Sequence, residues 1–504
     1  MSKTLSGGRL SSKRTDVAEF TSSIKDDARL ADAVIDINKA HAIMLMEQKI
    51  IKPRDVAKLL QALTAKLDLK MDSSSEDIHM AVEEAVLQHV GPEVGGNMHI
   101  AKSRNDQVAT AIRMELRKQL INVMSYIVSM QQALAEIAEK HVETLILEYT
   151  HLQPAQPVTF AHYLISRFDA LDRDLQRLQS AYTRVNLSPM GAGALATTSF
   201  PISRERVADL LGFDGLVENS IDAVGSRDFI LETIGALTLT AVNLSQIAED
   251  LIVWSSPGFG NIELPDEFAS TSSIMPQKKN PEVPEVIRAR ASHVLGDFVA
   301  AASAMKSMPS TYNLDFQEVT PKLWASVENV MGSLKIFAAL VPHLKVSCDV
   351  SAKALSSFVA ATELANILVR EYNVPFRSAH KITGALVKAL LQAKKTFADA
   401  TPKLLRKIAK ETSGIELSIN AECLAGLADP LKIVESHKVK GGPASDEVER
   451  ALAARKKTVL LSKSNISKMK KELEKADNKL QSKSKSLSHV NSPETEDLKT
   501  KSCR

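Results

Sequence analysis

A stretch without glycine or proline constrains the fold more than any other feature of this sequence. Residues 107–149 lack both residue types and are rich in helix formers. Because glycine and proline are the usual interruptions of a helix, the pattern predicts one very long helix across the whole stretch. A second long helix is expected over residues 226–255, which are apolar on nearly every face. Such a helix has to be covered on all sides, in the centre of a large bundle or of an oligomer.

Further helices complete an all-α pattern. A third long helix is expected from about residue 281 to 308 and a fourth after Pro321, while shorter helical segments precede and follow them. Strand-like alternation is nearly absent, and aromatic residues make up only 4% of the chain. We therefore expect a central long-helix bundle flanked by two smaller helical domains. The boundaries that we predict are 1–106 for the N-terminal domain, 107–350 for the bundle, 351–461 for the C-terminal domain and 462–504 for a tail.

The tail stands apart in composition. Residues 455–504 carry 14 basic and 6 acidic side chains, so the rest of the chain is net negative. A basic tail on a mildly acidic body does not resemble the basic face of a nucleic-acid-binding domain. We expect a short helix or weak coiled coil, then disorder past Ser482. A solvated extension explains the composition more simply than an interaction arm. The apolar positions at helical spacing in the tail are Ile466, Met469, Leu473, Ala476 and Leu480.

Several classes of protein are excluded by what the sequence lacks. Cys348, Cys423 and Cys503 have no metal-ligand or redox spacing, and a sparse, odd number of cysteines is typical of a reducing cytosol. Dinucleotide, P-loop and HExxH motifs are missing, so we expect no cofactor and no metal. The N-terminus carries no long apolar segment, and no run of about 18 apolar residues occurs. The sequence thus predicts a cytoplasmic protein without a membrane span.

Two polar segments lie at opposite ends of the predicted long helix. In the first, SRNDQ, Asn105 or Asp106 could cap the helix, whereas Arg104 has the geometry to bind a carboxylate in a bidentate fork. In the second, THLQP, Thr150 and His151 precede two prolines and are expected to end the helix in a turn. A histidine there could simply cap helix carbonyls, but it is also the best acid–base candidate in the chain.

A third polar segment, STSSIMPQKKNPEVPE, spans residues 270–285. Prolines punctuate it, so residues 256–280 are expected to form a long loop, and a loop of this length in a compact fold is either functional or disordered. Asn280 and Pro281 are the predicted N-cap and first residue of the next helix. A helix N-terminus beside two lysines is a ready site for an anion. Together, the three segments indicate carboxylate handling with acid–base groups.

The segment SSIMPQKKNP resembles the signature loop of the fumarase/aspartase superfamily, whose members cleave C–N or C–O bonds and release fumarate. Gln277 and the Lys278–Lys279 pair resemble the argininosuccinate lyases within it. Segments elsewhere agree, in order: GGRL, SIKDDARL, EDIH, SRNDQVAT, YTHLQPAQP, SRDF, AEDL, PSTYNLDFQE, ATELA, PFRSAH and KGGPASDEV. The resemblance covers about residues 7–450, and the tail after about Leu461 lies outside it.

The resemblance implies a reaction and a set of residue roles. The substrate would be argininosuccinate, cleaved to arginine and fumarate by anti β-elimination through an aci-carboxylate carbanion, in the last step of arginine biosynthesis. The implied enzyme is a cofactor-free homotetramer whose sites are shared between subunits. The implied catalytic residues are Ser272 as the base, His151 as the proton-handling partner on the leaving-group side and Glu285 as the residue that orients it. The implied substrate-binding residues are Ser23, Asn105, Thr150, Lys278, Asn280, Tyr312 and Gln317, and the implied supporting residues are Asp77, Arg104, Asp106, Gln153 and Ser273.

Some positions depart from the family pattern, and two alternatives stay open. Thr271 stands where the loop usually has glycine, HIAKSRND replaces HTGRSRND, Thr320 stands where a lysine is usual, and Glu363 replaces a more common aspartate. Either of Ser272 and His151 could remove the carbon-bound proton. The alternative functions are another fumarate-releasing lyase, such as adenylosuccinate lyase, and a non-catalytic structural homologue of the delta-crystallin kind.

Overall fold

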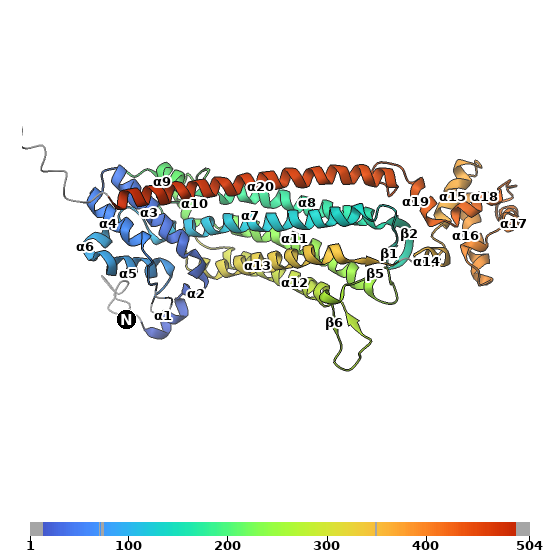
Figure 1. The fold of residues 1–504 in the computed structure, drawn as a ribbon, viewed down its shortest axis with the longest axis horizontal. Coiled ribbons are helices and arrows are strands. Elements are labelled where there is room, and N and C mark those ends of the chain that lie inside the picture. The colour runs from blue at the N-terminus through green and yellow to red at the C-terminus, as the bar shows by residue number, and fades with distance from the viewer. Residues whose placement is uncertain (1–13, 70, 72–74, 348–349, 490–504) are drawn as a thin grey trace, which may run out of the picture.

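A computed structural model describes residues 14–69, 71, 75–347 and 350–489 of the chain. The molecule is elongated, with the N-terminal helices at one end, long parallel and antiparallel helices along its length, and a separate helical lobe at the other end (Figure 1). The GGRL segment, Cys348 and Cys503 lie outside the described residues. The N-terminal elements are α1 Thr15–Thr21, α2 Ile24–Asp27, η1 Ala28–Leu30, α3 Ala31–Glu47, α4 Pro53–Thr64, α5 Ile78–Val90, α6 Pro92–Gly95 and η2 Gly96–His99.

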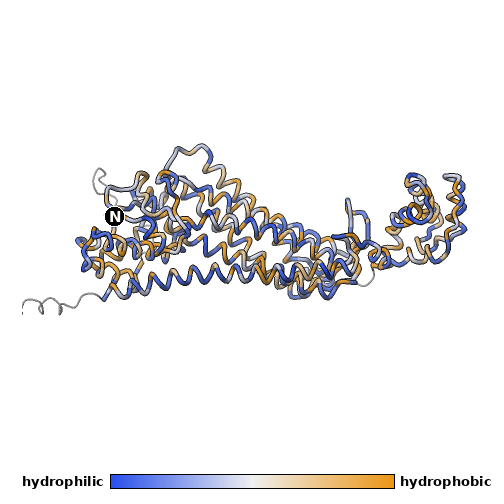
Figure 2. The backbone as a smooth tube through the Cα atoms, turned by 90° about the horizontal axis from the view of Figure 1, so that it is seen from above, coloured by the Kyte–Doolittle hydropathy of each residue, from blue (hydrophilic) through white to orange (hydrophobic). Residues whose placement is uncertain are grey.

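A bundle of long helices forms the body. One continuous core of buried apolar side chains joins the bundle to the N-terminal helices, which explains how the two parts hold a fixed orientation. Figure 2 shows apolar residues recurring along each bundle helix. The bundle helices are α7 Arg104–Glu139, α8 Phe160–Val185, α11 Asp228–Ser255, α12 Glu282–Met305, α13 Phe316–Leu340 and α20 Ser445–Ser488, with the short α9 Arg204–Leu211 and α10 Ser220–Gly225 between α8 and α11. The predicted all-α bundle is confirmed.

The prediction of one helix over residues 107–149 is wrong at its C-terminal end. Helix α7 stops at Glu139, and β1 (Leu145–Thr150) pairs with β2 (Gln153–Thr159) in an antiparallel hairpin. The β1 segment holds Ile, Tyr and Thr, which suit a strand, and the ladder to β2 outweighs the weak helical preference of this end. The other described ladders are two-residue pieces: β3 Leu187–Ser188 with β4 Gly215–Leu216, β5 Ile262–Glu263 with β8 Lys345–Val346, and β6 Ser270–Thr271 with β7 Lys279–Asn280.

Helices α12 and α13 begin at residues other than those predicted from the sequence. Helix α12 begins at Glu282 with Pro281 as its N-cap, and Asn280 pairs with Ser270 in β7 instead of capping the helix. The expected loop 256–280 contains β5, β6, β7 and the turn η3 Asp266–Phe268. Helix α13 begins before Pro321 and carries this proline inside its second turn. The proline has no N–H to give to the Gln317 carbonyl, so the helix lacks this hydrogen bond in its second turn.

The C-terminal lobe has its own core. Its buried residues lie between Ala360 and Ile433 and form a cluster separate from that of the bundle, and Figure 2 shows the lobe standing off one end of the molecule. The lobe elements are α14 Val350–Ser356, α15 Ala361–Arg370, α16 Phe376–Gln392, η5 Phe397–Asp399, α17 Pro402–Ser413, α18 Ala421–Leu427 and α19 Pro430–Ser436, and η4 Val341–His343 links the bundle to them. The chain leaves the bundle after α13, builds the lobe and returns in α20.

The prediction of a solvated tail is wrong for the part that the structure describes. Helix α20 runs without interruption from Ser445 to Ser488 along the whole bundle (Figure 1). Ile466 and Leu480 are buried against the bundle core, so the three-four spacing of the tail marks a packed face. Charge composition misled the prediction because charged residues dominate this helix, while the few apolar residues such as Ile466 and Leu480 decide its packing.

One chain does not cover helix α11 on all sides. Leu239 and Val242 on α11 are exposed in the single chain, as are Leu295 and Val299 on the neighbouring α12. Within the described residues, α11 is also the one helix long and apolar enough to span a membrane by length and composition, and 56% of its most apolar window is buried in the bundle. It is therefore a core helix of the bundle with one open apolar strip.

Candidate active site

A cavity of about 250 Å³ lies between the N-terminal helices and one end of the bundle. It gathers polar residues that are far apart in the sequence, from the start of α2, the start of α5, the first turn of α7 and the segment entering α13. Six of the predicted site residues line it: Ser23, Asp77, Arg104, Asn105, Tyr312 and Gln317. The structure thus brings together the part of the predicted site that is expected to bind and support the substrate.

The first turn of α7 fixes this wall of the cavity. Ser103 is the N-cap and forms a capping box with Asp106, which corrects the prediction that Asn105 or Asp106 caps the helix. Asp106 is fully buried, and its second oxygen accepts from the N–H groups of Gly191 (3.1 Å) and Gly193 (2.8 Å). Burial raises the pKa of Asp106 to about 6. Its role is structural, since it anchors the loop after β3 beneath the cavity.

Arg104 is already engaged by protein carboxylates. It forms an ion pair with Asp77, and its second nitrogen lies 3.7 Å from Glu83. Asp77 in turn caps α5 by accepting from the N–H of Met80 at 2.8 Å. The pair therefore ties α5 to α7, which agrees with a supporting role for both residues.

Sequence reasoning missed Asp27, which also lines the cavity. The Ser23 hydroxyl donates to its carboxylate. Burial raises the pKa of Asp27 to about 7; the Ser23 hydrogen bond opposes the rise, and the nearby Asp77 adds to it. An acidic residue at the end of a four-residue helix looks like ordinary surface charge in the sequence, so no signal other than its place in the SIKDDARL segment could have singled it out.

Arg227 was also missed. Its side chain is only 1% exposed at the edge of the cavity, and its guanidinium carbon lies 4.4 Å from the centre of the Phe316 ring. One nitrogen donates to the carbonyls of Val224 and Ser226, while Nε and the second terminal nitrogen have no partner among the described residues. Burial lowers the pKa of Arg227 to about 10. A permanent positive charge thus lies directly behind Tyr312 and Phe316.

The positions that depart from the family pattern have distinct structural outcomes. Ala101 has a φ of 60°, a left-handed conformation in which the glycine of the usual pattern would be unstrained. Lys102 donates to Asn38, and burial lowers its pKa to about 7. Thr320 lines the cavity, whereas Lys322 faces away, 4.0 Å from Asp297. Lys322 therefore does not replace the usual lysine in this cavity.

The second group of predicted residues lies at the opposite end of the bundle. Thr150 and Gln153 are paired at the tip of the β1–β2 hairpin, and His151 with Leu152 forms the two-residue turn between them. Both turn residues have positive φ, 56° and 57°, as a tight primed turn requires. His151 is exposed there, so the predicted turn is confirmed, although a strand and not a helix leads into it.

The third group lies on the loop between β6 and β7, which projects from the side of the bundle (Figure 1). The Ser272 hydroxyl accepts from the N–H groups of Ile274 (3.4 Å) and Met275 (3.3 Å). Lys279 pairs with Asp266 (2.6 Å) and Glu263 (3.1 Å) across the base of the loop. Lys278 has no ion pair within the described chain, and Ser273, Lys278 and the nearby Glu285 of α12 are exposed. The two adjacent lysines therefore have different surroundings.

One chain does not join these groups into one site. Helix α7 alone separates the cavity from the hairpin, and its 36 residues span roughly 54 Å at 1.5 Å per residue. Among the described residues, no hydrogen bond or ion pair connects His151 with Glu285 or with Ser272. Within one chain, the cavity and the hairpin tip are therefore too far apart to act on the same small molecule.

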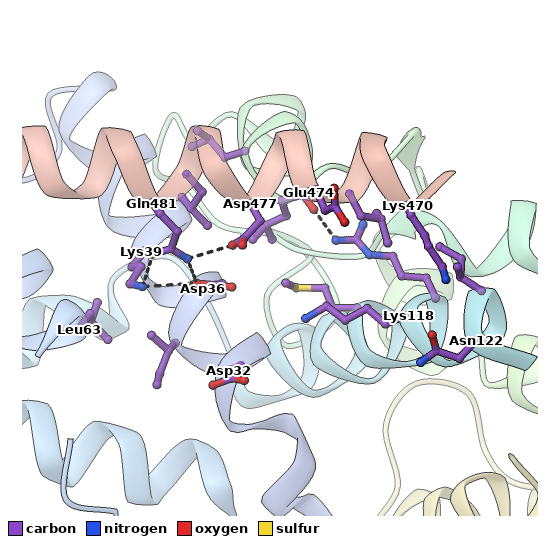
Figure 3. Close-up of a pocket in the computed structure, with 18 residues that line it drawn as sticks. Asp32, Asp36, Lys39, Leu63, Lys118, Asn122, Lys470, Glu474, Asp477 and Gln481 are labelled. Carbon is purple, nitrogen blue, oxygen red and sulfur yellow. Dashed lines mark hydrogen bonds and ion pairs between the residues drawn. The ribbon is translucent and has the colours of Figure 1, made fainter. Parts of the chain in front are cut away.

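A second, larger cavity lies elsewhere and holds none of the predicted site residues. It measures about 660 Å³ and lies between α20 and the helices α3, α7 and α9 (Figure 3). The acidic and basic side chains that line this cavity are equal in number. Among them, Lys39 and Asp36 already bond to each other and to Gln481. The smaller cavity is therefore the better candidate for substrate binding.

Comparison with known proteins identifies the family. Residues 9–296 match the sequence profile of the lyase family, and residues 358–428 match that of the argininosuccinate lyase C-terminal domain. The chain is 44% identical to the argininosuccinate lyase of Methanocaldococcus jannaschii over 88% of this chain and 92% of that one. The chain belongs to the argininosuccinate lyase family. It is a carbon–nitrogen lyase by this membership, and the family resemblance predicted from the sequence is confirmed.

Solved structures agree with the family at the level of the fold. A crystal structure of EDDS lyase in complex with formate superposes with a TM-score of 0.85 at 28% identity, covering 93% of this chain and 95% of that one. A class II fumarase from Schistosoma mansoni superposes with a TM-score of 0.69 at 17% identity, covering 84% and 95%. The argininosuccinate lyase family thus shares its long-helix bundle with the fumarases, as the sequence predicts.

Proposed function

We propose that the protein converts argininosuccinate to arginine and fumarate, as the last step of arginine biosynthesis in the cytoplasm. The cavity that gathers Ser23, Asn105, Tyr312 and Gln317 at the start of α7 carries the proposal, because these are the positions at which the family resemblance expects substrate contacts. Its hydroxyl and amide groups suit the amino-acid end of the substrate.

The reaction needs a base, an acid and groups that stabilise the negative charge of the intermediate. The base removes a proton from the carbon beside a succinyl carboxylate, and the electron pair moves onto that carboxylate as an aci-carboxylate. The pair then returns to form the double bond of fumarate while the C–N bond breaks, and the acid protonates the leaving guanidino nitrogen. Preorganised cations and N–H groups lower the barrier by meeting the charge as it develops.

Ser272 is proposed as the base. A hydroxyl is a weak base at neutral pH, so its anion has to be stabilised. The N–H groups of Ile274 and Met275 already point at its oxygen, and Lys278 is exposed on the same loop with no competing ion pair in the part of the chain that the structure describes. Closure of the loop over the substrate would bring Lys278 and Asn280 to the succinyl carboxylates and exclude water.

His151 is proposed as the proton-handling partner. The turn at the tip of the hairpin exposes its imidazole beside Thr150 and Gln153, and Glu285 of another chain would orient the ring.

We propose that the active unit is a homotetramer in which each site takes one group of residues from each of three chains. Two observations support this. The cavity and the hairpin tip lie at opposite ends of α7, roughly 54 Å apart, which is too far for both to act on one small molecule in one chain. In addition, α11 and α12 expose an apolar strip that includes Leu239, Val242, Leu295 and Val299. Apolar strips of this kind on long helices are typical of oligomer interfaces.

Turnover tests the proposal directly. The purified protein is incubated with argininosuccinate or adenylosuccinate, and fumarate is followed by its absorbance. Release of fumarate from argininosuccinate is expected; release from adenylosuccinate alone would replace the proposed substrate, and no release from either would favour a structural role of the crystallin kind.

A pair of serine variants tests the mechanism. Ser272→Ala is expected to lower kcat by about 10³-fold, because general-base catalysis is worth about 10²–10⁴-fold. Ser273→Ala, on the same loop, is expected to stay within a few-fold of the parent. Full activity of a folded Ser272→Ala tetramer would remove Ser272 from the mechanism.

A further inference from the structure

We propose that residues 462–488 of α20, here called the C-terminal strut, position the N-terminal helices that carry one wall of the substrate cavity. None of the sequence motifs that carry the family resemblance lies in the strut. The inference rests on the proposed function for its kinetic readout, but its structural basis is independent.

Ion pairs link the strut to α9 and α3. The Lys479 ammonium lies 2.9 Å from both carboxylate oxygens of Asp209 on α9. Asp209 also pairs with Arg206, and Arg206 binds both oxygens of Glu47, the last residue of α3, at 2.7 and 3.1 Å. Lys483 of the strut pairs with the same Glu47. The result is one network in which two lysines of the strut hold the C-terminal ends of two other helices.

A second contact fixes the middle of α3 (Figure 3). The Gln481 amide donates to Asp36 at 2.9 Å, and its oxygen accepts from the buried Lys39 at 2.8 Å. Burial raises the pKa of Asp36, and Lys39 opposes the rise. Gln61 of α4 donates to the Ser488 carbonyl at 2.6 Å at the end of the strut. The strut therefore holds α3 at two levels and also holds α4.

Close packing supports these polar contacts. Gly212, with φ of 70°, follows α9, and a Cβ there would lie 2.5 Å from the Cβ of Ala476. The Gly212 carbonyl accepts from Arg117 of α7 at 2.9 Å. Leu480 is 2% exposed. The strut thus lies in van der Waals contact with α9 at a point that is itself bonded to the bundle.

The segment that the strut holds leads directly into the substrate cavity. Helices α2, η1 and α3 follow one another without a linker from Ile24 to Glu47. Ser23 and Asp27, which line the cavity, begin and end the first turn of this segment. Because α3 is a stiff rod held at its middle and at its far end, its placement sets where Ser23 and Asp27 lie relative to Asn105 and Tyr312. Ser23 and Asp27 are the groups whose placement we assign to the strut.

Matched lysine pairs test the proposal. In the tetrameric, full-length protein, Lys479→Ala/Lys483→Ala removes the strut's ion pairs, and Lys479→Arg/Lys483→Arg keeps them. Lys471→Ala/Lys475→Ala removes the same charge from lysines of the strut that have no ion pair among the described residues. We expect Lys479→Ala/Lys483→Ala to raise KM for argininosuccinate about 5- to 10-fold, which corresponds to the loss of one or two part-buried ion pairs. The kcat of this variant should stay within two-fold of the parent. The arginine pair and the control pair should match the parent.

A purely stabilising strut would lower the melting temperature of Lys479→Ala/Lys483→Ala and leave KM unchanged in the folded tetramer, and this result would overturn the proposal. An equal rise of KM in the control pair would overturn it too, because the effect would then follow net charge. Amide hydrogen exchange of residues 24–47 provides a readout that needs no substrate. Faster exchange in the alanine pair alone is expected, and unchanged exchange would contradict the proposal even if the parent enzyme does not act on argininosuccinate.

Discussion

At the scale of single residues, the backbone at Ala101 has a cost that a substitution can remove. Ala101 adopts φ of 60°, a conformation that costs a residue with a Cβ roughly 1 kcal/mol and costs glycine little. Ala101→Gly is therefore expected to raise the free energy of unfolding by up to about 1 kcal/mol, measured by denaturant or thermal unfolding. Ala453→Gly, at an exposed position inside α20, should lower the free energy of unfolding by a similar amount. A lower stability of Ala101→Gly than of the parent would show that the backbone at Ala101 is not strained.

The carboxyl group of Asp27 predicts a pH dependence. Its pKa in the folded protein, about 7, lies above the ordinary value of 3.8. A raised carboxyl pKa means that the folded state favours the protonated form. The contribution of protonated Asp27 to the free energy of unfolding is therefore fully present below about pH 4 and is lost as pH rises to about 7.

Melting curves of the parent and of Asp27→Asn between pH 4 and 8 measure the effect. The variant cannot ionise, so its stability relative to the parent is expected to rise by on the order of 2 kcal/mol across this window, after discounting for partial exposure, and to level off above pH 7. Parallel curves over the whole range would show that burial of Asp27 costs nothing.

Sequence could identify these residues only in part. The polar segment SRNDQ points to Arg104 and Asn105, whereas only the family resemblance points to Ser23, Tyr312 and Gln317; the structure places all five in one cavity. Asp27 and Arg227 owe their properties to burial, which depends on helices far away in the chain.

At the scale of elements, the loop between β6 and β7 has an anchor at its base. Lys279 pairs with Glu263 and Asp266, and exposed pairs of this kind contribute less than about 1 kcal/mol each to global stability. Lys279→Ala is therefore expected to leave the melting temperature nearly unchanged while it speeds limited proteolysis within residues 271–279. Lys278→Ala should do the reverse: it loses activity without a change in proteolysis. Equal protease sensitivity of the two variants would contradict an anchoring role for Lys279.

The elements also show where sequence patterns fail. The long helices were predictable because glycine and proline are absent from α7 and because α11 is apolar on most faces. The β1–β2 hairpin was missed because its ladder lies between segments whose local preferences are weak, so pairing decided the outcome. A short helix was expected in the strut, but its packing against the bundle was missed because charged residues dominate its composition, while a few apolar positions such as Leu480 decide its packing.

At the scale of the whole molecule, a site shared between chains predicts complementation. Ser272→Ala and Asn105→Ala are each expected to be inactive as pure tetramers, because each removes a different group from every site. If these groups come from different chains, mixed tetramers formed by dissociating and reassociating the two variants together regain some sites with neither substitution. Recovery of up to about a quarter of parental activity is expected for random mixing, measured beside the size of the mixture by light scattering. No recovery in mixed tetramers would place both groups in one chain.

The route of the chain through the molecule has a consequence for its synthesis. Helix α20 returns from the distal lobe and packs along α7, α8 and α9, yet it is the last described element to be made. On the ribosome, the bundle therefore stays open along one side, and the apolar surface that Ile466 and Leu480 later cover stays exposed until α20 has been made. The lobe, which has its own core, can fold well before that moment. Nascent chains that stall after the lobe would be the species most in need of a chaperone.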